Sequence, residues 1–431
     1  MAFETAFTMD TSSIKYGPGV TREVGFDMKQ LGAKRVMVVT DPHLAHSEPV
    51  SIALEALRAE GVDAVLFDRV RIEPTDASFK QAIQFATDGR FDGYVAVGGG
   101  STIDTAKAAN LYATFPADFL AYVNPPIGEG RPVPGRLKPL IAIPTTAGTG
   151  SETTGVAIFD FLEMHAKTGI AHRALRPAIG IVDPDNTRTL PRMAAACTGF
   201  DVLCHALEAL TALPYHRRPA PANPGLRTTY QGANPISDVR ATQAIQMVSC
   251  SLVRAVEDPS DDEARSQMIL ASCFAGIGFG NAGVHLPHGM SYPVAGMVRD
   301  YVPAGYVSDH PIIPHGLAVV LNAPAVFRFT APADPQRHLY AARLMGADEY
   351  IRVDVSEAGP EDAGELLASA LVDLMRQTGM PNGLSAVGYG PGDVPALVAG
   401  TTPQQRVTKL CPRPFDEAEL AQLFLDSMRC W

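Results

Sequence analysis

The chain has 431 residues, which at roughly 100–200 residues per domain predicts two or three domains. Hydrophobic residues make up 46% and charged residues 19%, a composition that excludes a disordered chain. The net charge of -11 argues against nucleic-acid or anionic-membrane partners. No apolar run reaches the ~18 residues that a membrane helix needs. We therefore expect a globular protein with a substantial core.

The ends and cysteines of the chain bear on its location. The segment MAFETAFTMD has no basic region and no apolar region, so it predicts neither a secretory signal nor a transit peptide. Six cysteines are scattered without a CxxC pair: Cys197, Cys204, Cys250, Cys273, Cys411 and Cys430. Isolated cysteines of this kind are typical of a reducing compartment. We therefore expect a cytoplasmic protein.

Short apolar, β-rich runs alternate with helix-like stretches in the first half of the chain. Helical stretches are expected at residues 52–60 and 78–87. The predicted strands are residues 36–40, 64–67, 94–97, 140–143, 156–159 and 179–182. This alternation favours a parallel α/β sheet, and we assign residues 1–190 to this domain.

From about Pro191 onward the spacing of the apolar residues becomes typical of helices. Residues 362–375 carry apolar side chains at helical spacing, and residues 416–428 do the same. We therefore predict an all-helical second domain over residues 191–431. Two proline-rich irregular stretches, residues 125–139 and 214–235, interrupt the chain.

A glycine-rich loop follows the strand predicted at residues 94–97. Gly98, Gly99, Gly100 and Ser101 lead into a helix expected to begin near Thr102. Glycines let the backbone approach a ligand closely, and a helix N-terminus favours an anion such as a pyrophosphate. Alternatively, Ser101 forms a capping-box-like helix start together with Asp104, which is compatible with phosphate binding. The GxGxxG fingerprint is absent.

Two further features suit a nucleotide. The loop PTTAGTGSE at residues 144–152 is rich in hydroxyl groups and backbone donors that can hold ribose and phosphate oxygens, although it also fits a simple turn. Asp41 closes a strand, where a carboxylate can bind a ribose diol and repel a 2′-phosphate, so NAD is favoured over NADP. The alternative for Asp41 is a helix cap.

A metal-binding pattern lies in the second half. Asp201 and His205 are spaced to share one helix face, and His285, His288 and His315 follow. The carboxylate and three of these four imidazoles would form a four-ligand divalent site with an open position. Such a metal would polarise an alcohol or carbonyl oxygen as a Lewis acid. The donor types suit Fe(II), Zn(II), Co(II) or Ni(II), and each histidine alone also fits a structural role.

Five motifs resemble, in chain order, those of the iron-containing (group III) alcohol dehydrogenases: GGGSTIDTAK, PTTAGTGSE, GFDVLCHALE, HGMSYP and PHG. The resemblance spans residues 16–428. The stretches LPYHRRPAPANPG, YQGANPISD and QQRVTKL are similar to one branch, the hydroxyacid-oxoacid transhydrogenases.

This resemblance implies a dehydroquinate synthase-like fold with an α/β nucleotide domain and a helical domain, and homo-oligomers. It implies NAD and a divalent metal, Fe²⁺ with Zn²⁺ as the alternative. The implied metal ligands are Asp201, His205, His288 and His315. The implied NAD contacts are Asp41, Gly99, Gly100, Ser101, Asp104, Thr145, Thr146, Thr149 and Lys167.

The implied reaction couples two hydride transfers between small molecules. A hydroxyacid such as 4-hydroxybutyrate becomes the semialdehyde, while a 2-oxoacid such as 2-oxoglutarate becomes the 2-hydroxyacid. The alternative is an NAD-dependent primary alcohol or 4-hydroxybutyrate dehydrogenase. Because both substrates are carboxylates, we hypothesise that Arg217, Arg218 or Arg227 clamps one of them, although all three also fit a solvated loop.

The sequence departs from the family pattern next to the third metal ligand. Many members have a second histidine four residues after it, where this chain has Tyr292. His285 lies three residues before His288 and could relay a proton in its place. A packing or supporting role for His285 is the alternative.

Overall fold

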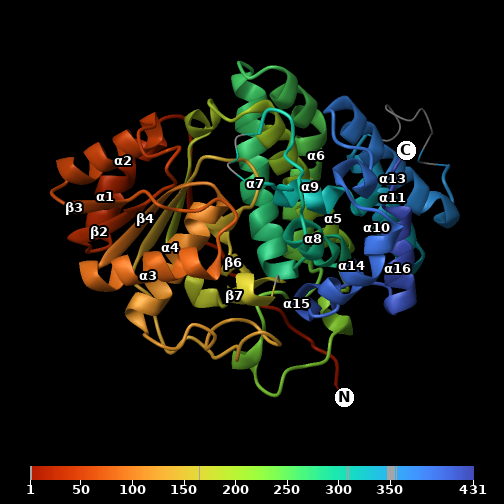
Figure 1. The fold of residues 1–431 in the computed structure, drawn as a ribbon, viewed down its shortest axis with the longest axis horizontal. Coiled ribbons are helices and arrows are strands. Elements are labelled where there is room, and N and C mark those ends of the chain that lie inside the picture. The colour runs from red at the N-terminus through yellow and green to blue at the C-terminus, as the bar shows by residue number, and fades with distance from the viewer. Residues whose placement is uncertain (1, 165, 307, 309, 347–354, 356) are drawn as a thin grey trace. The chain divides into compact units, whose positions relative to one another are not determined.

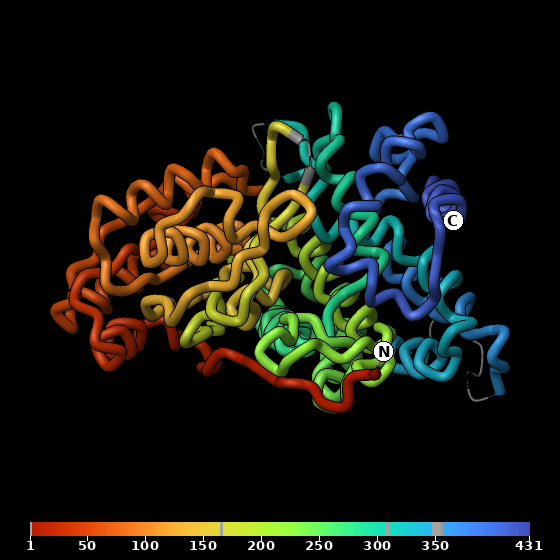
Figure 2. The backbone as a smooth tube through the Cα atoms, turned by 90° about the horizontal axis from the view of Figure 1, so that it is seen from below, coloured from red at the N-terminus to blue at the C-terminus, as the bar shows by residue number. Residues whose placement is uncertain are grey.

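The computed structural model describes residues 2–164, 166–306, 308, 310–346, 355 and 357–431. The chain forms two compact units, one of residues Asp10–Leu190 and one of Met1–Met9 with Pro191–Trp431. The predicted boundary gave residues 1–9 to the first domain. In the structure Glu4 N–H donates to the Arg218 carbonyl, and Ala220 N–H donates to the Ala2 carbonyl. The first residues therefore run along the second unit (Figure 2).

The first unit is built around a six-stranded sheet of order β1-β8-β5-β4-β2-β3 (Figure 1). All neighbouring strands in it are parallel, as the sequence predicted. The strands are β1 (Ser13–Tyr16), β2 (Arg35–Val39), β3 (Asp63–Phe67), β4 (Gly93–Gly98), β5 (Leu140–Pro144) and β8 (Ile179–Val182).

Helices cover both faces of this sheet. Val36 and Val38 face α1 (Val24–Gln30) and α2 (Glu48–Ala59) in one apolar core. Met37 and Val39 face the opposite way, toward α3 (Asp76–Gly89) and α4 (Gly100–Thr114). Because both faces are buried, the strands read as continuous apolar runs rather than alternating ones.

One predicted strand lies outside the parallel sheet. Residues 156–159 belong to β6 (Val156–Phe161), which pairs antiparallel with β7 (Ala166–Ala171) in a separate two-stranded sheet. Residues 162–165 alone connect the two strands, and a parallel crossover requires a dozen or more residues. β1 and β7 were not predicted, because polar residues interrupt both: β1 carries Ser13 and Lys15, and β7 carries Lys167 and Thr168.

The second unit is helical where the structure describes it, which confirms the predicted fold class. Its central helix α5 (Arg192–Thr211) packs against α6 (Pro235–Glu257), α7 (Asp262–Ala282) and α9 (His315–Val320). α5 is apolar enough to cross a membrane, but 78% of its apolar window is buried inside the protein, as in a core helix. The other α-helices that the structure describes in this unit are α8 (Leu286–Gly296), α10 (Ala323–Thr330), α11 (Pro335–Leu344), α13 (Ala363–Gln377), α14 (Val394–Thr401), α15 (Gln405–Thr408) and α16 (Glu417–Asp426).

Candidate functional site

The predicted nucleotide-binding residues meet at one edge of the parallel sheet. Asp41 follows β2, Gly98 ends β4 and Thr145 follows β5, and these three strands are neighbours in the order β2-β4-β5. β3 is added beside β2 at one side of the sheet. β4 lies on the other side of β2, and β5 is added beyond β4, so the order of the strands reverses between β2 and β4. A ligand crevice is expected beyond the strand ends at such a switch point. Asp41 and the glycine loop flank it.

The glycine loop leaves a helix N-terminus available for an anion. α4 begins at Gly100 rather than near Thr102, and its N-cap Gly99 offers no side chain. The capping-box interpretation of Ser101 and Asp104 is therefore wrong. A methyl group on Gly98 would overlap Thr102, and one on Gly100 would lie 2.5 Å from the Thr149 methyl carbon. The glycines thus also let the loops around the two strand ends pack together.

Asp104 connects the two loops through its carboxylate. One oxygen accepts a hydrogen bond of 2.5 Å from Ser151 Oγ, and the other accepts one of 2.9 Å from the Ile158 backbone N–H. The buried Lys107 ammonium donates to Ser151 Oγ and to the Val156 carbonyl. Both carboxylate oxygens of Asp104 thus have partners within the protein, and its direct contact with NAD stays a prediction.

Asp41 and Lys167 also have protein partners. Asp41 Oδ1 accepts hydrogen bonds from the backbone N–H groups of His43 and Leu44, which is the capping role considered for it. Lys167 Nζ donates to Glu73 at 2.5 Å and lies 3.0 Å from Asp160 Oδ1. Burial lowers the pKa of Lys167, but these two carboxylates outweigh burial and raise it overall.

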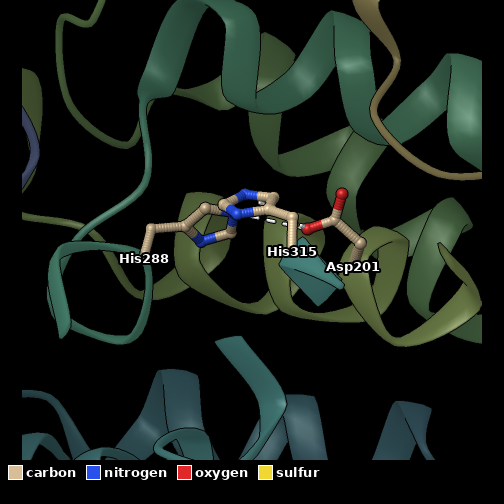
Figure 3. Close-up of side chains that lie close together, drawn as sticks. All are labelled: Asp201, His288 and His315. Atoms are coloured by element: carbon tan, nitrogen blue, oxygen red, sulfur yellow. Dashed lines mark ion pairs between the residues drawn. The ribbon is translucent and has the colours of Figure 1, made fainter. Parts of the chain in front are cut away.

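The second unit brings three predicted metal ligands together. Asp201, His288 and His315 place one donor atom each within 4.8 Å of one another (Figure 3). Asp201 Oδ1 lies 3.5 Å from His288 Nε2 and 3.8 Å from His315 Nε2. Ligand atoms bound at about 2.1 Å to one tetrahedral ion lie roughly 3.4 Å apart. The observed spacing therefore suits a shared ion and is long for direct hydrogen bonds.

Unsatisfied polar atoms point to the same conclusion. Asp201 Oδ1, His288 Nε2 and His205 Nδ1 are buried and have no hydrogen-bond partner in the described structure. Leaving a buried donor or acceptor unpaired costs about 1–3 kcal/mol, and more for a charged group. A divalent ion would satisfy these atoms at once, so the donor set fits a metal. His315 keeps 25% of its side chain exposed, which leaves one side of the cluster open.

His205, the fourth predicted ligand, lies at the margin of this cluster. Its Nδ1 is 3.8 Å from Asp201 Oδ1, and its ring stacks on Phe279 on one side and on His288 on the other. Burial lowers the pKa of His205 to about 3, so the ring is neutral, as a metal ligand must be. Ligation by His205 stays a prediction.

Glu208 supports the cluster, and the sequence reasoning assigned it no role. Its carboxylate lies 2.5 Å from His288 Nδ1 and accepts a 2.6 Å hydrogen bond from the His285 backbone N–H. Carboxylates that hold metal-ligating histidines in this way fix the ring orientation. The spacing contained a signal, because Glu208 follows Asp201 by seven residues and His205 by three, on one face of α5.

The charges of the two acids favour a cation at His288. Burial lowers the pKa of His288, but Glu208 and Asp201 outweigh it and raise that pKa to about 10. Burial likewise raises the pKa of Asp201, and the surrounding histidines more than reverse this effect. The cluster therefore attracts positive charge, whether a proton or a metal ion.

Two glycines allow the helices to converge. Gly283 has φ +98°, a conformation that L side chains rarely adopt, and it ends α7 before the chain turns by 105° into α8. His288 lies in the first turn of α8, and His315 begins α9. A methyl group on Gly316 would overlap the Cys197 carbonyl of α5, so a glycine is needed there for α9 to approach Asp201.

His285 lies next to Glu208, which accepts a hydrogen bond from its backbone N–H. It is fully buried, its Nε2 is 3.0 Å from Thr211 Oγ1, and burial lowers its pKa to about 4. It is not among the three residues whose donor atoms converge. Its place next to Glu208 suits the supporting role considered for it, and a proton-relay role stays a prediction.

The predicted substrate arginines contact the N-terminal segment or solvent. Arg227 donates two hydrogen bonds to the Glu4 carboxylate, at 3.0 and 3.2 Å. Arg218 donates to Thr228 Oγ1, and Arg217 is exposed at the end of a short 3-10 helix, Tyr215–Arg217. These arginines thus lie in the segment that contacts residues 2–9, and no described contact links them to the metal cluster.

Comparison with known proteins identifies the family. The sequence profile of the iron-containing alcohol dehydrogenases matches residues 11–184, and that of the C-terminal part of the Fe-containing alcohol dehydrogenase family matches residues 229–428. The chain is 56% identical over 428 residues to the mitochondrial hydroxyacid-oxoacid transhydrogenase of Pongo abelii, covering 99% of this chain and 90% of that protein.

Solved structures agree with this result. A 1,3-propanediol oxidoreductase superimposes with a TM-score of 0.85 at 28% identity, over 98% of this chain and 100% of that one. The sulfoacetaldehyde reductase of Bifidobacterium kashiwanohense, solved with NAD⁺, gives a TM-score of 0.77 at 25% identity, over 99% and 98%.

The comparisons also correct one expectation. Curated relatives at 55–56% identity carry names that place them in mitochondria, which contradicts the cytoplasmic location expected from the sequence. The matched segments cover most of the chain, and both units take part. The chain belongs to the iron-containing alcohol dehydrogenase family and is an oxidoreductase.

Proposed function

We propose that this chain is a hydroxyacid-oxoacid transhydrogenase. The observation that carries the proposal is its 56% identity, over nearly its whole length, to a relative with that activity in its name. The buried group of Asp201, His288 and His315 supports it, because this donor set suits the divalent metal that alcohol oxidation requires in this family.

The overall reaction balances without a net redox partner. A hydroxyacid such as 4-hydroxybutyrate loses a hydride from its carbinol carbon and a proton from its hydroxyl, and becomes the semialdehyde. A 2-oxoacid such as 2-oxoglutarate gains the hydride at its keto carbon and a proton at its oxygen, and becomes the 2-hydroxyacid. Both substrates are small molecules, and we expect the enzyme to be a homo-oligomer.

The residues divide the work between the two units. Asp201, His205, His288 and His315 would hold the metal, for which we propose Fe²⁺ with Zn²⁺ as the alternative, and Glu208 orients His288. The residues at the ends of β2, β4 and β5 would hold NAD, with the pyrophosphate at the uncapped N-terminus of α4. When bound, the metal supplies Lewis acidity and NAD supplies the hydride acceptor and donor.

The decisive experiment is a coupled assay without added nucleotide. Purified, Fe²⁺-reconstituted protein is mixed with 4-hydroxybutyrate and 2-oxoglutarate, and 2-hydroxyglutarate is quantified. Formation of that product supports transhydrogenation with retained cofactor. The Asp201→Asn variant is the control, because any turnover that survives loss of the only carboxylate among the proposed ligands comes from a contaminant.

One observation favours a second candidate. The 1,3-propanediol oxidoreductase that shares this fold acts, by its name, on a simple alcohol. An NAD-dependent alcohol or 4-hydroxybutyrate dehydrogenase would give no 2-hydroxyglutarate in the coupled assay. It would instead produce NADH once NAD is added.

A further inference from the structure

The proposed function requires a cation for the substrate carboxylates, and the inference drawn here rests on that function. The three arginines predicted for this task lie beside residues 1–9, with Arg227 already paired to Glu4. A different guanidinium, that of Arg406 on α15 (Gln405–Thr408), is half-buried in the helical unit that carries the metal cluster, and its Nη1 atom is fully covered. α15 packs against α8, the helix of His288.

Arg406 is held by two tyrosines. Its Nη2 donates a 2.9 Å hydrogen bond to the Tyr292 hydroxyl, and its guanidinium carbon lies 5.0 Å from the centre of the Tyr230 ring. Its Nη1 is buried and has no acceptor in the described part of the chain. No carboxylate within ion-pair distance of Arg406 occurs among the described residues either.

A guanidinium that is half-buried and has a buried nitrogen without an acceptor is costly when no counter-ion lies near it, and two other arginines of this protein have a counter-ion. Arg176 lies 3.4 Å from Asp10, and Arg265 pairs with Asp262. Arg406 has aromatic and hydroxyl contacts but no anionic partner among the residues that the structure describes. Such a group is stabilised when an anionic ligand arrives, because the ligand supplies the missing charge and hydrogen-bond acceptors.

Tyr292 connects this guanidinium to the metal cluster. It follows His288 by one turn of α8, and its ring lies 6.2 Å from the His315 ring, nearly parallel to it at 22°. A single side chain therefore separates Arg406 from a proposed metal ligand. This is also the position where the sequence departs from the histidine of many family members.

We propose that Arg406 binds a carboxylate of each substrate in turn, and that the Tyr292 hydroxyl orients the Arg406 guanidinium for this purpose. The ligand class is a short carboxylate with a hydroxyl or keto oxygen that can reach the metal cluster. A guanidinium fork matches a carboxylate with two parallel hydrogen bonds, which a neutral alcohol cannot form. The replacement of a histidine by Tyr292 then serves selection of acids over plain alcohols.

The first test measures KM and kcat separately in the coupled assay. Arg406→Gln is expected to raise the KM for 4-hydroxybutyrate and 2-oxoglutarate by about 10- to 100-fold, the loss of a charge-assisted hydrogen-bond pair. Arg406→Lys should recover part of this loss, because it restores the charge without the fork. Tyr292→Phe keeps the core volume and is expected to raise KM by a smaller factor, so the idea stays testable if Arg406→Gln fails to fold.

A matched control separates binding from folding. Arg413 also stacks on an aromatic ring, that of Phe329 at 4.1 Å, and pairs with Glu419, but no described contact links it to Tyr292. Arg413→Gln should leave both KM values unchanged. A purely structural role for Arg406 would instead lower kcat and the Tm while the KM values stay constant, and that result would overturn the proposal.

The second test is direct binding and does not depend on turnover. Calorimetry follows glutarate, a non-reacting dicarboxylate, as it binds to metal-loaded wild-type protein and to the three variants at Arg406 and Tyr292. We expect the Kd to rise at least about tenfold in Arg406→Gln and not in Arg413→Gln. Equal Kd values, or no binding to the wild type, refute the role of Arg406. A wild type that makes no 2-hydroxyglutarate refutes the proposed function instead.

Discussion

The candidate nucleotide site lies at the carboxyl edge of the parallel sheet and consists of loop backbone and hydroxyl groups. The candidate metal site lies in the helical unit and consists of ionisable side chains on helices. At the sheet edge Asp41 and Asp104 already accept hydrogen bonds, and Lys167 contacts two carboxylates. In the helical unit Asp201 and His288 keep buried atoms that have no hydrogen-bond partner in the part of the chain that the structure describes.

This difference shows how each unit would recognise its ligand. The sheet edge presents a helix N-terminus whose geometry exists before any ligand arrives, because internal hydrogen bonds hold the loops. The metal cluster brings together electron-pair donor atoms of Asp201 and His288, and these atoms gain a partner only when a cation binds. Changes at the cluster should therefore act mainly on metal binding, and changes at the sheet edge mainly on nucleotide binding.

The largest effect is expected from Asp201→Asn. Asp201 is the only carboxylate among the proposed ligands, and the amide removes the charge that attracts a cation. We expect bound metal, measured by elemental analysis of the purified protein, to fall close to zero and activity to fall with it. Asp426→Asn, an exposed change on α16, is the control and should keep full metal content. Full occupancy in Asp201→Asn would rule out the cluster as the metal site.

A smaller effect is expected from Glu208→Gln. The amide retains the shape of the side chain but loses the charge that supports His288. Removing such a partner typically lowers metal affinity by about 10–100-fold. Competition with a chelator measures this affinity, and Glu263→Gln, a change of an exposed carboxylate on α7, is the matched control. An unchanged affinity would show that Glu208 only supports the fold.

Gly100→Ala tests whether the nucleotide site can be changed without affecting the metal site. The added methyl would lie 2.5 Å from the Thr149 methyl carbon, and such overpacking typically costs about 1–3 kcal/mol. We expect the affinity for NAD to fall by roughly tenfold, as fluorescence titration with NADH can show, while metal content stays constant. Gly392→Ala is the control, because its methyl would meet no atom within 4 Å. Loss of metal in Gly100→Ala would mean that the two regions depend on one another.

The smallest effect is expected from Glu4→Gln, outside both regions. Hydrogen bonds from Arg227 hold the pKa of Glu4 down to about 2, below its ordinary value of 4.5. Because the folded pKa is lowered, this contact stabilises fully above pH 4.5 and is lost as the pH falls toward 2. The protection factors of the amides of residues 2–9, which correct the exchange rates for the pH dependence of intrinsic exchange, should therefore fall several-fold as acid is added in the wild type. In Glu4→Gln they should be low already at neutral pH, with no change in Arg217→Gln.

The sequence alone predicted the features that depend on local patterns. Continuous apolar runs identified five strands of the parallel sheet, since buried parallel strands are apolar on both faces. Three glycines after the strand predicted at residues 94–97 indicated a backbone-lined loop before a helix. The spacing of four residues along α5 placed Asp201 and His205 on one face. Each of these signals lies within about ten consecutive residues.

Only the tertiary structure decided which distant segments meet. It moved β6 out of the parallel sheet, placed residues 1–9 on the helical unit, and paired Arg227 with Glu4, 223 residues away in sequence. It also placed Arg406 against Tyr292, 114 residues away, and brought α9 to Asp201 through Gly316. Such contacts depend on side-chain packing and loop length across the whole chain, and no local periodicity encodes them.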